Sequence, residues 1–454
     1  MYNYIRVEEV LNMNIAIPKP VNEVMTCFYD RNHEAYLIGS TIRNMVMNEK
    51  PKKYLIATDA SIEQAKKILS SYSTYTGGEN NKVLTVLNNK FPMEITTYRT
   101  QSLESDLAEC DFTMNSLAYS DEDGLIDYNT GIIDINNRII RLNGDDEEII
   151  KKDPLRILRA IRLSAEYAMK IDLNTQQIMF DNKDLLKGVA AERIRDELNK
   201  ILMTDKCAFY LKKYFDIFIV VIPELALMEK FNQCTPQHVY DCLEHTFVTV
   251  NAIKKDPDGK SNLELTLAGL LHDIAKPYTF SKDEQGNGHF KGHSEKGSLI
   301  ARDIMNRLKY SKKQIQKVTK LIEYHDTPIP EDIGELRLFI NRVSLENIND
   351  LYKLRKANIY AKNPAYIGDL FKLKQSFEKI KEQSKKTNLV HKSDLKISAR
   401  ELLEIGVPQN RIGEVIDKLH ILILKGVLKN NHDKLLSYVE KNFFKEEEEI
   451  KKVA

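Results

Sequence analysis

The stretch YLIGSTIRNMVMNEKPKKYLIATDA, residues 36–60, constrains the fold more than any other part of the chain. Its first apolar residues, 36–38, predict a short strand, Gly39 and Ser40 predict a turn, residues 41–48 a helix, and residues 54–58 a second strand. A helix over 62–71 and a strand over 93–99 continue this alternation. We therefore expect a small α/β head with a mixed sheet.

The sequence predicts helices both before and after this head. Before the first strand, apolar residues recur at helical spacing and predict an amphipathic helix that packs behind that strand (Val21, Val24, Met25 and Phe28). From Gly144 onward the pattern becomes helical. A chain of 454 residues exceeds one hydrophobic core and should divide into roughly three domains.

Composition excludes several classes of protein. Lys and Arg number 67 against 66 Asp and Glu, so any RNA contact must come from local basic patches rather than a global field. The five cysteines include no Cys-x-x-Cys pair and are typical of reduced cytoplasmic thiols. No run approaches the roughly 18 apolar residues that span a bilayer, and the N-terminus lacks a signal-peptide core. We expect a soluble, cytoplasmic protein without a membrane partner.

The opening stretch resembles the signature of the class II tRNA nucleotidyltransferases, which include CCA-adding enzymes and bacterial poly(A) polymerases. The family pattern is Gly-Gly-x-x-Arg-Asp followed by a strand with Asp-x-Asp-Ile-Ala-Thr. Gly39 and Arg43 match it, whereas the second glycine is Ser40 and the next aspartate is Asn44.

The two aspartates that bind magnesium in the family fall on Lys53 and Leu55. Strand alternation puts both on the face that presents those carboxylates. Because phosphoryl transfer is mostly positioning and charge neutralisation by the metal ions, we expect an impaired polymerase site and no magnesium in the head. An ordinary solvated lysine and a core leucine at these positions would have the same consequence.

Two further motifs of the head are partly retained. In MEITTYR, Glu94 survives, but one carboxylate cannot clamp two metals, and its pairing with Arg99 is the alternative. ECDFTMNSLAY resembles the family's Arg-Arg-Asp-Phe-Thr-Ile-Asn-Ala-Leu. Glu109 and Cys110 replace the two arginines that meet the triphosphate, while Asp111 is kept. A glutamate there would repel phosphate.

The segment KDPLRILRAIRLSAEY matches the family's neck motif, in which an Asp and an Arg read the incoming base. These are Asp153 and Arg156, with Arg159 close to the same helix face. Asp153 as a helix cap before Pro154 is the alternative. The resemblance thus implies a nucleotide-binding set: Gly39, Arg43, Asp111, Asp153, Arg156 and Arg159.

Residues 394–430 resemble the family's tail, which holds the tRNA elbow. The resemblance implies that lysines of the C-terminal helices contact RNA phosphates. The alternative is that these lysines form the solvated face of amphipathic helices.

A second resemblance lies between residues 236 and 335. CLEHTFVTV, LAGLLHDIAKP, GHFKGHSEKG and LIEYHDTP resemble the HD phosphohydrolase domain that many bacterial members carry. The metal residues it implies are His245, His272, Asp273, His293, His325 and Asp326. Of these, His293 and His325 serve a second metal or phosphate, and the others are the direct ligands.

Imidazoles and carboxylates suit Mn, Fe, Ni, Co or Zn. Such a metal lowers the pKa of its water and so yields hydroxide, which attacks a phosphate ester. His272, Asp273 and Lys276 would be catalytic, Lys276 by neutralising the substrate phosphate. A rival zinc quartet (Cys234, His238, Cys242, His245) would span about 16 Å along one helix, which is too long for one ion.

The expected fold is α+β: a nucleotidyltransferase-like head (1–140), a helical neck (141–235), an HD domain (236–335) and a helical tRNA-binding body and tail (336–454). The resemblance implies RNA, specifically tRNA, as partner and ATP and CTP as candidate ligands, without DNA. Three functions stay open: an HD phosphohydrolase with a non-polymerising head, an active CCA-adding enzyme, and a non-catalytic RNA-binding or regulatory protein.

Overall fold

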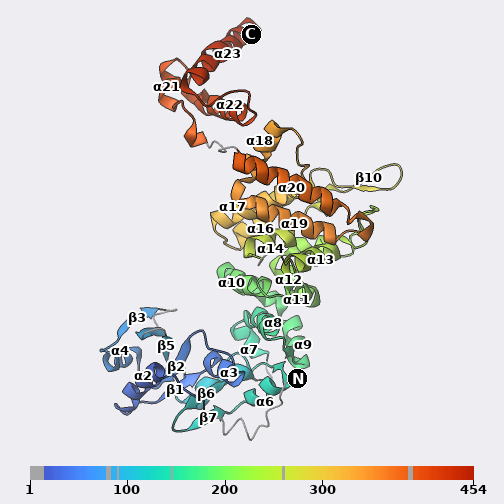
Figure 1. Ribbon diagram of the computed structural model, residues 1–454. Coiled ribbons are helices and arrows are strands. Elements are labelled where there is room, and N and C mark those ends of the chain that lie inside the picture. Colours follow the sequence, from blue (N-terminus) through green and yellow to red (C-terminus); the bar gives the residue numbers. More distant parts are fainter. Residues whose placement is uncertain are drawn as a thin grey trace. The chain divides into compact units, whose positions relative to one another are not determined.

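The computed structural model describes residues 15–77, 83–88, 91–144, 147–257, 261–386 and 392–453 (Figure 1). The chain forms two compact units. The first takes residues 1–204 and 213–221, and the second takes residues 205–212 and 222–454.

The first unit is built on a mixed sheet. Its strands are β1 (Ala35–Ile38), β2 (Tyr54–Thr58), β3 (Ser73–Gly77), β4 (Val83–Asn88), β5 (Phe91–Thr97), β6 (Leu117–Ser120) and β7 (Gly124–Asp127). They lie in the order β3-β4-β5-β2-β1-β6-β7. Strands β2 and β5 pair in parallel and the other neighbours are antiparallel. The predicted mixed sheet is confirmed.

Helices of the head follow from local sequence signals. They are α2 (Lys19–Tyr29), α3 (Ser40–Val46), α4 (Ile62–Ile68), α5 (Leu103–Ala108) and α6 (Gly131–Asn137). Helix α2 buries the predicted apolar face and contacts β1 and β5. Helix α4 starts with a capping box between Ser61 and Gln64. Gly39, with φ 61° and ψ −129°, joins β1 to α3 in a conformation that side chains disfavour.

The neck of the first unit is helical. Its elements are α7 (Glu148–Lys152), α8 (Arg156–Tyr167), α9 (Leu173–Asp181), α10 (Ala191–Leu202) and α12 (Phe215–Val221), with a parallel pair of short strands, β8 (Ile139–Ile140) and β9 (Lys170–Ile171). Helices α8 and α10 pack together. A buried ion pair joins them, because Arg162 Nε lies 2.6 Å from the Glu197 carboxylate.

The second unit is mostly helical. Its elements are α13 (Cys242–Lys254), α14 (Leu263–Leu271), α15 (Lys276–Thr279), β10 (Ser281–Lys282), β11 (Gly288–His289), α16 (His293–Arg307), α17 (Lys312–Tyr324), α18 (Ile333–Val343), α19 (Ile348–Tyr360), α20 (Asp369–Lys386), α21 (Ala399–Glu404), α22 (Ile412–Leu424) and α23 (His432–Val453). Helix α11 (Cys207–Lys213) connects the two units in sequence. The last helices form a separate apolar cluster that includes Leu402, Leu419 and Leu435.

Helix α14 lies at the centre of the HD region because its sequence, LELTLAGLL, is apolar on nearly all sides. It packs against α13, α17 and α19. A Cβ atom on Gly269 would lie 2.5 Å from Ile253 Cδ1 of α13. The glycine therefore allows the close approach of α13, which carries His245, and α14, whose end is followed by His272.

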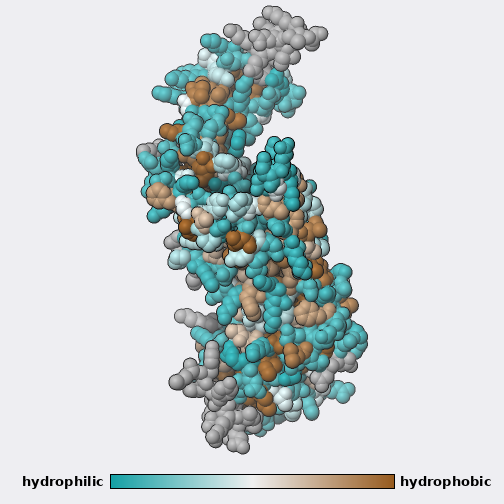
Figure 2. All heavy atoms as spheres, turned by 90° about the vertical axis from the view of Figure 1, so that its right-hand side faces the viewer, coloured by the Kyte–Doolittle hydropathy of each residue, from teal (hydrophilic) through white to brown (hydrophobic). Residues whose placement is uncertain are grey.

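On the face shown in Figure 2, apolar side chains are dispersed among hydrophilic ones. Within the described ranges, no helix has the length and hydropathy needed to cross a membrane.

Candidate functional site

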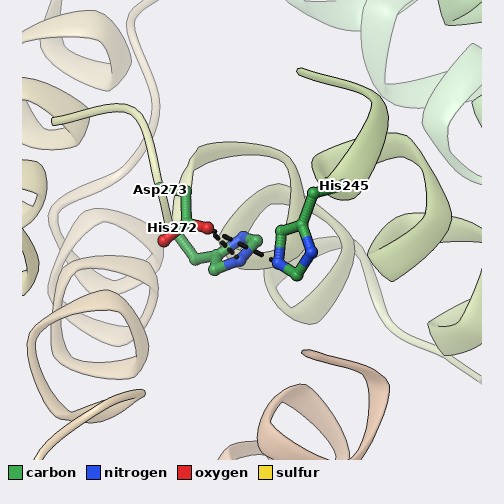
Figure 3. Close-up of side chains that lie close together, drawn as sticks. All are labelled: His245, His272 and Asp273. Atoms are coloured by element: carbon green, nitrogen blue, oxygen red, sulfur yellow. Dashed lines mark ion pairs between the residues drawn. The ribbon is translucent and has the colours of Figure 1, made fainter. Parts of the chain in front are cut away.

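Four histidines converge on one carboxylate in the second unit. His245 lies on α13, His272 and Asp273 follow the end of α14, His293 opens α16, and His325 follows α17. All five side chains are buried, and Asp273 is 1% exposed. Figure 3 shows His245 and His272 directed toward the carboxylate of Asp273.

The Nε2 atoms of the four rings face the Asp273 oxygens. On Oδ2, the distances are 3.1 Å to His272 and 3.5 Å to His245. On Oδ1, the distances are 3.6 Å to both His293 and His325. The Nε2 atoms of His293 and His325 are themselves 3.3 Å apart.

The opposite nitrogen of each ring fixes the tautomer. Nδ1 lies 2.9 Å from Gly269 O in His272, 2.8 Å from Phe290 O in His293, 2.7 Å from Ile322 O in His325 and 3.1 Å from Ala361 O in His245. A carbonyl oxygen only accepts, so each Nδ1–H donates and a neutral ring presents the Nε2 lone pair. This is how metal-binding histidines are held.

Electrostatics keep these groups in the ligand form. Burial lowers the pKa of His325 to about 4 and that of His245 well below its usual value. Burial opposes ionisation of Asp273, but His272 and the Lys276 ammonium outweigh it and hold the pKa of that carboxyl well below its usual range. Burial thus favours the neutral form of His245 and His325 beside a carboxylate anion.

This donor set fits a divalent cation. Two overlapping groups could each hold an ion: His245, His272 and Asp273, and Asp273, His293 and His325. Both Asp273 oxygens and His272 Nε2 are buried without an aligned hydrogen bond in the described structure. Lone pairs that face one another in a dry site repel, and a cation between them removes that repulsion.

The cluster lies at a cleft of about 700 Å³. Asp273, His293 and His325 line it, together with Lys291 and Lys362. Asp326, expected among the direct ligands, also lines this cleft, but its side chain is exposed and belongs to neither group. It follows the end of α17, so its carboxylate stands at the rim instead of in the buried cluster.

Lys276 lines the same cleft, but its side chain is nearly buried and engaged within the protein. It is 5% exposed. Its Nζ lies 2.8 Å from Asp273 Oδ2 and donates to Gln233 Oε1 at 2.7 Å. His238 Nε2 lies 3.4 Å away, and burial, with help from Lys276, lowers the pKa of His238 to about 3. Lys276 therefore balances the charge of Asp273.

Sequence reasoning missed Asn358, whose Oδ1 lies 3.0 Å from His245 Nε2. Asn358 is on α19, inside the region assigned to the body and tail. It is 113 residues from His245, and nothing in its Lys-rich surroundings indicates a site.

The sequence argument against the rival zinc quartet assumed that its four residues lie on one helix, and this assumption is wrong. Helix α13 begins at Cys242, so Cys234 and His238 precede the helix instead of lining it. No metal-binding group in the described structure includes Cys234 or Cys242. The Cys242 Sγ is buried, 3.8 Å from the carbonyl oxygen of Asp273.

In the head, the ammonium of Lys53 lies 2.5 Å from the Glu94 carboxylate. Leu55 of β2 pairs with Glu94 of β5 in the parallel register. The expected pairing of Glu94 with Arg99 is wrong, because Arg99 turns to Asp106 at 2.9 Å, on the helix that follows β5. A lysine thus pairs with the retained carboxylate.

Glu109 and the neck form a second set of ion pairs. Lys152 Nζ lies 3.3 Å from Glu109 Oε1. A lysine of the neck thus pairs with the glutamate that replaces an arginine of the family pattern. Asp111 accepts from Arg159 at 2.8 Å.

The alternative of Asp153 as a cap of α8 is wrong. Helix α8 has no side-chain cap, and Leu155 is its N-cap residue. The Asp153 carboxylate instead accepts from Arg193 at 3.1 Å. Arg156 donates to the Glu109 carbonyl at 3.1 Å.

Arg43, expected at the nucleotide, is buried in the scaffold. Its guanidinium donates to Asn44 at 2.9 Å, to Asn115 at 2.7 Å and to the Tyr167 hydroxyl at 2.8 Å. It also lies over the Tyr167 ring. These contacts tie α3 to the end of α8, so Arg43 holds the head against the neck.

Three family models match this chain. Residues 35–141 match the "Poly A polymerase head domain", residues 168–228 the "Probable RNA and SrmB- binding site of polymerase A", and residues 243–358 the "HD domain". A CCA-adding enzyme of Ligilactobacillus salivarius is 27% identical over 428 residues, which are 90% of this chain and 92% of that enzyme. The chain belongs to the class II tRNA nucleotidyltransferase family and carries an HD domain.

One further relative and two solved structures agree with this family assignment. An A-adding tRNA nucleotidyltransferase of Deinococcus radiodurans is 30% identical over 57% of this chain and 60% of its own length. The fold matches the Bacillus stearothermophilus CCA-adding enzyme in complex with CTP (TM-score 0.63, 19% identity, 95% of this chain and 100% of that one). It also matches the Thermotoga maritima CCA-adding enzyme complexed with tRNA (TM-score 0.56, 18% identity, 96% and 98%).

Proposed function

We propose that this tRNA nucleotidyltransferase-family protein binds RNA and hydrolyses phosphate esters at its HD site, and that its head does not add nucleotides. The observation that carries the hydrolase is the set of four Nε2 atoms within 3.1–3.6 Å of Asp273. The observation that carries the silent head is the Lys53–Glu94 ion pair.

The residues of the HD site have distinct tasks. Asp273 and the imidazoles around it supply the donor atoms that would hold the metal, and Lys276 offsets part of the carboxylate charge. A divalent ion bound there supplies Lewis-acid chemistry, which polarises a phosphate ester and lowers the pKa of water. Lys291 and Lys362, which line the cleft, attract the phosphate. RNA ends such as 2′,3′-cyclic phosphates are suitable substrates because they place such an ester at an accessible terminus.

The head lacks the charges that phosphoryl transfer needs. With Lys53 and Leu55 in place of two aspartates, Glu94 is the remaining carboxylate, and it already has a cation. A magnesium ion about 4 Å from the Lys53 ammonium would be repelled by several kcal/mol at an effective dielectric of about 20, before solvent screening. Glu109 adds a negative charge where the triphosphate would lie.

The names of the relatives indicate the partners. Several are CCA-adding enzymes, and the titles of solved neighbours include complexes with CTP, ATP and tRNA. We therefore propose tRNA as the RNA and CTP or ATP as candidate ligands of the head. Lysines of the helical body would bind phosphates in a salt-sensitive way.

An active CCA-adding enzyme is the second candidate, favoured by the 92% coverage of an enzyme with that name. Incubation with Mg²⁺, labelled CTP or ATP, and tRNA that lacks its terminal CCA separates the two. We expect no incorporation. Incorporation at ordinary enzyme rates would refute the silent head.

The hydrolase is tested with a phosphomonoester and a 2′,3′-cyclic nucleotide in the presence of Mn²⁺, Ni²⁺ or Co²⁺. We expect metal-dependent hydrolysis that His272→Ala and Asp273→Ala abolish. His432→Ala is the matched control, since His432 is exposed and its ring pairs with Glu401 in the C-terminal region. Absence of hydrolysis with every metal would favour the non-catalytic RNA-binding alternative.

A further inference from the structure

The two oxygens of Asp273 have different surroundings. Oδ2 already has a cation, because the Lys276 ammonium lies 2.8 Å away. Oδ1 has the Nε2 atoms of His293 and His325, each at 3.6 Å, and among the described residues no ammonium or guanidinium is paired with it. The carboxylate is thus neutralised on one side and available on the other.

The Oδ2 side is also closed to solvent. His245 and His272 are 0% exposed and do not line the cleft, whereas Lys276 and Asn358 of this side do line it. Nδ1 of His245 faces the Ala361 carbonyl oxygen, and its Nε2 lies 3.0 Å from the side-chain amide of Asn358. Asn358 is neutral, so this side gains no second anion to balance another divalent charge.

The Oδ1 side has the geometry of an ion site. Its three donor atoms form a nearly regular triangle with edges of 3.3, 3.6 and 3.6 Å. Ligands about 2.0–2.1 Å from a tetrahedral ion are about 3.4 Å from one another. All three residues line the cleft, from which substrate or water could reach an ion held there.

We propose that this HD site holds one divalent ion, bound by Asp273 Oδ1, His293 and His325, and that Lys276 and Asn358 close the Oδ2 side. His245 and His272 are then positioning residues. This inference rests on the proposed metal-dependent hydrolase and reverses the roles that the sequence suggested for the two histidine pairs. Two imidazoles and one carboxylate favour Zn, Co or Ni over Mg.

The test measures binding of Co²⁺ alone to the full chain, by calorimetry and by the visible absorption of the bound ion. We expect one ion per chain. His293→Gln and His325→Gln should each weaken binding at least about 100-fold, because a ligand matters more than a supporting residue. The matched variant His245→Gln should cost about 10-fold or less. Circular dichroism checks that each variant is folded.

A variant designed to create a second metal site tests whether Lys276 and Asn358 prevent metal binding on the Oδ2 side. Lys276→Met with Asn358→Asp removes the resident ammonium and adds an anion beside His245, so we expect a second Co²⁺ per chain. Two ions bound to the wild type, or binding lost in His245→Gln and kept in His293→Gln, would overturn the placement. A wild type that binds no Co²⁺, Ni²⁺, Zn²⁺ or Mn²⁺ would instead overturn the metal-dependent hydrolase and this inference with it.

Discussion

The ion pair between Lys53 and Glu94 puts an ammonium beside the retained carboxylate of the head. In the family pattern, carboxylates on this face need metal ions to offset their mutual repulsion. Here the ammonium provides that charge from within the chain. With exposed fractions of 46% and 31%, the pair contributes little to stability, up to about 1 kcal/mol.

Arg43 is the opposite case, a buried cation with a structural task. Arg43→Met leaves Asn44, Asn115 and Tyr167 without their donor, and we expect the free energy of unfolding to fall by roughly 3 kcal/mol. Urea denaturation followed by circular dichroism measures it. Lys53→Met is the control, with a change below about 1 kcal/mol. Equal effects of the two variants would contradict the scaffold role.

The buried histidines predict how stability depends on pH. Burial lowers the pKa of His325 to about 4, whereas an unfolded histidine titrates near 6.5. Between these values the unfolded chain binds a proton that the folded chain does not, so stability is full above pH 6.5 and falls as pH drops toward 4. The slope reaches roughly 1.4 kcal/mol per pH unit for each such histidine.

Denaturation of metal-free protein in EDTA from pH 7 to pH 4 measures this slope. In His325→Gln the slope should be shallower than in the wild type. An unchanged slope in that variant would show that other groups govern the acid sensitivity.

At the scale of elements, the joint between α8 and α10 depends on a buried carboxylate. Glu197 is 5% exposed and pairs with Arg162 and Lys200. Arg162→Met would leave Glu197 with the half-exposed Lys200 alone, and we expect a loss of roughly 3 kcal/mol in the free energy of unfolding.

The double variant Arg162→Met with Glu197→Leu tests whether the unpaired Glu197 carboxylate causes this loss of stability. Because it removes both charges and keeps apolar volume, it should recover much of the loss seen in Arg162→Met. A double variant that is less stable than the single one, in the same urea titration, would refute the ion-pair explanation.

Elements with strong periodicity could be predicted from the sequence. The strand over 54–58 and the buried face of α2 follow from local alternation and helical spacing, and both are observed. Side-chain contacts between residues far apart in the sequence could not be predicted in this way. Asn358 meets His245 from 113 residues away, and Glu94 prefers Lys53, 41 residues away, to nearby Arg99. Tertiary packing decides these contacts, and no local pattern encodes it.

At the scale of the whole molecule, binding of the proposed metal ion would stabilise the one compact unit that contains its ligands. All its candidate ligands belong to the second unit. A ligand at 100 times its dissociation constant stabilises the folded state by about 2.7 kcal/mol. We expect chelation to accelerate amide hydrogen exchange in α13, α14, α16 and α17 and to leave β1–β7 unchanged.

Hydrogen exchange read by mass spectrometry, with EDTA and after addition of Co²⁺, measures this effect. Equal acceleration in the head would mean that metal binds elsewhere or that the two units unfold together.

The carbonyl partners of the four rings differ in how far along the chain they lie. His272, His293 and His325 each donate Nδ1–H to a residue three positions earlier. These rings can thus be oriented as soon as their own turn forms. His245 depends on Ala361, 116 residues later, so its ring is aligned only after α19 has docked. During synthesis on the ribosome, the rings of His272, His293 and His325 can be oriented before residue 361 emerges, so the proposed ligands would be ready before His245 takes up its supporting position.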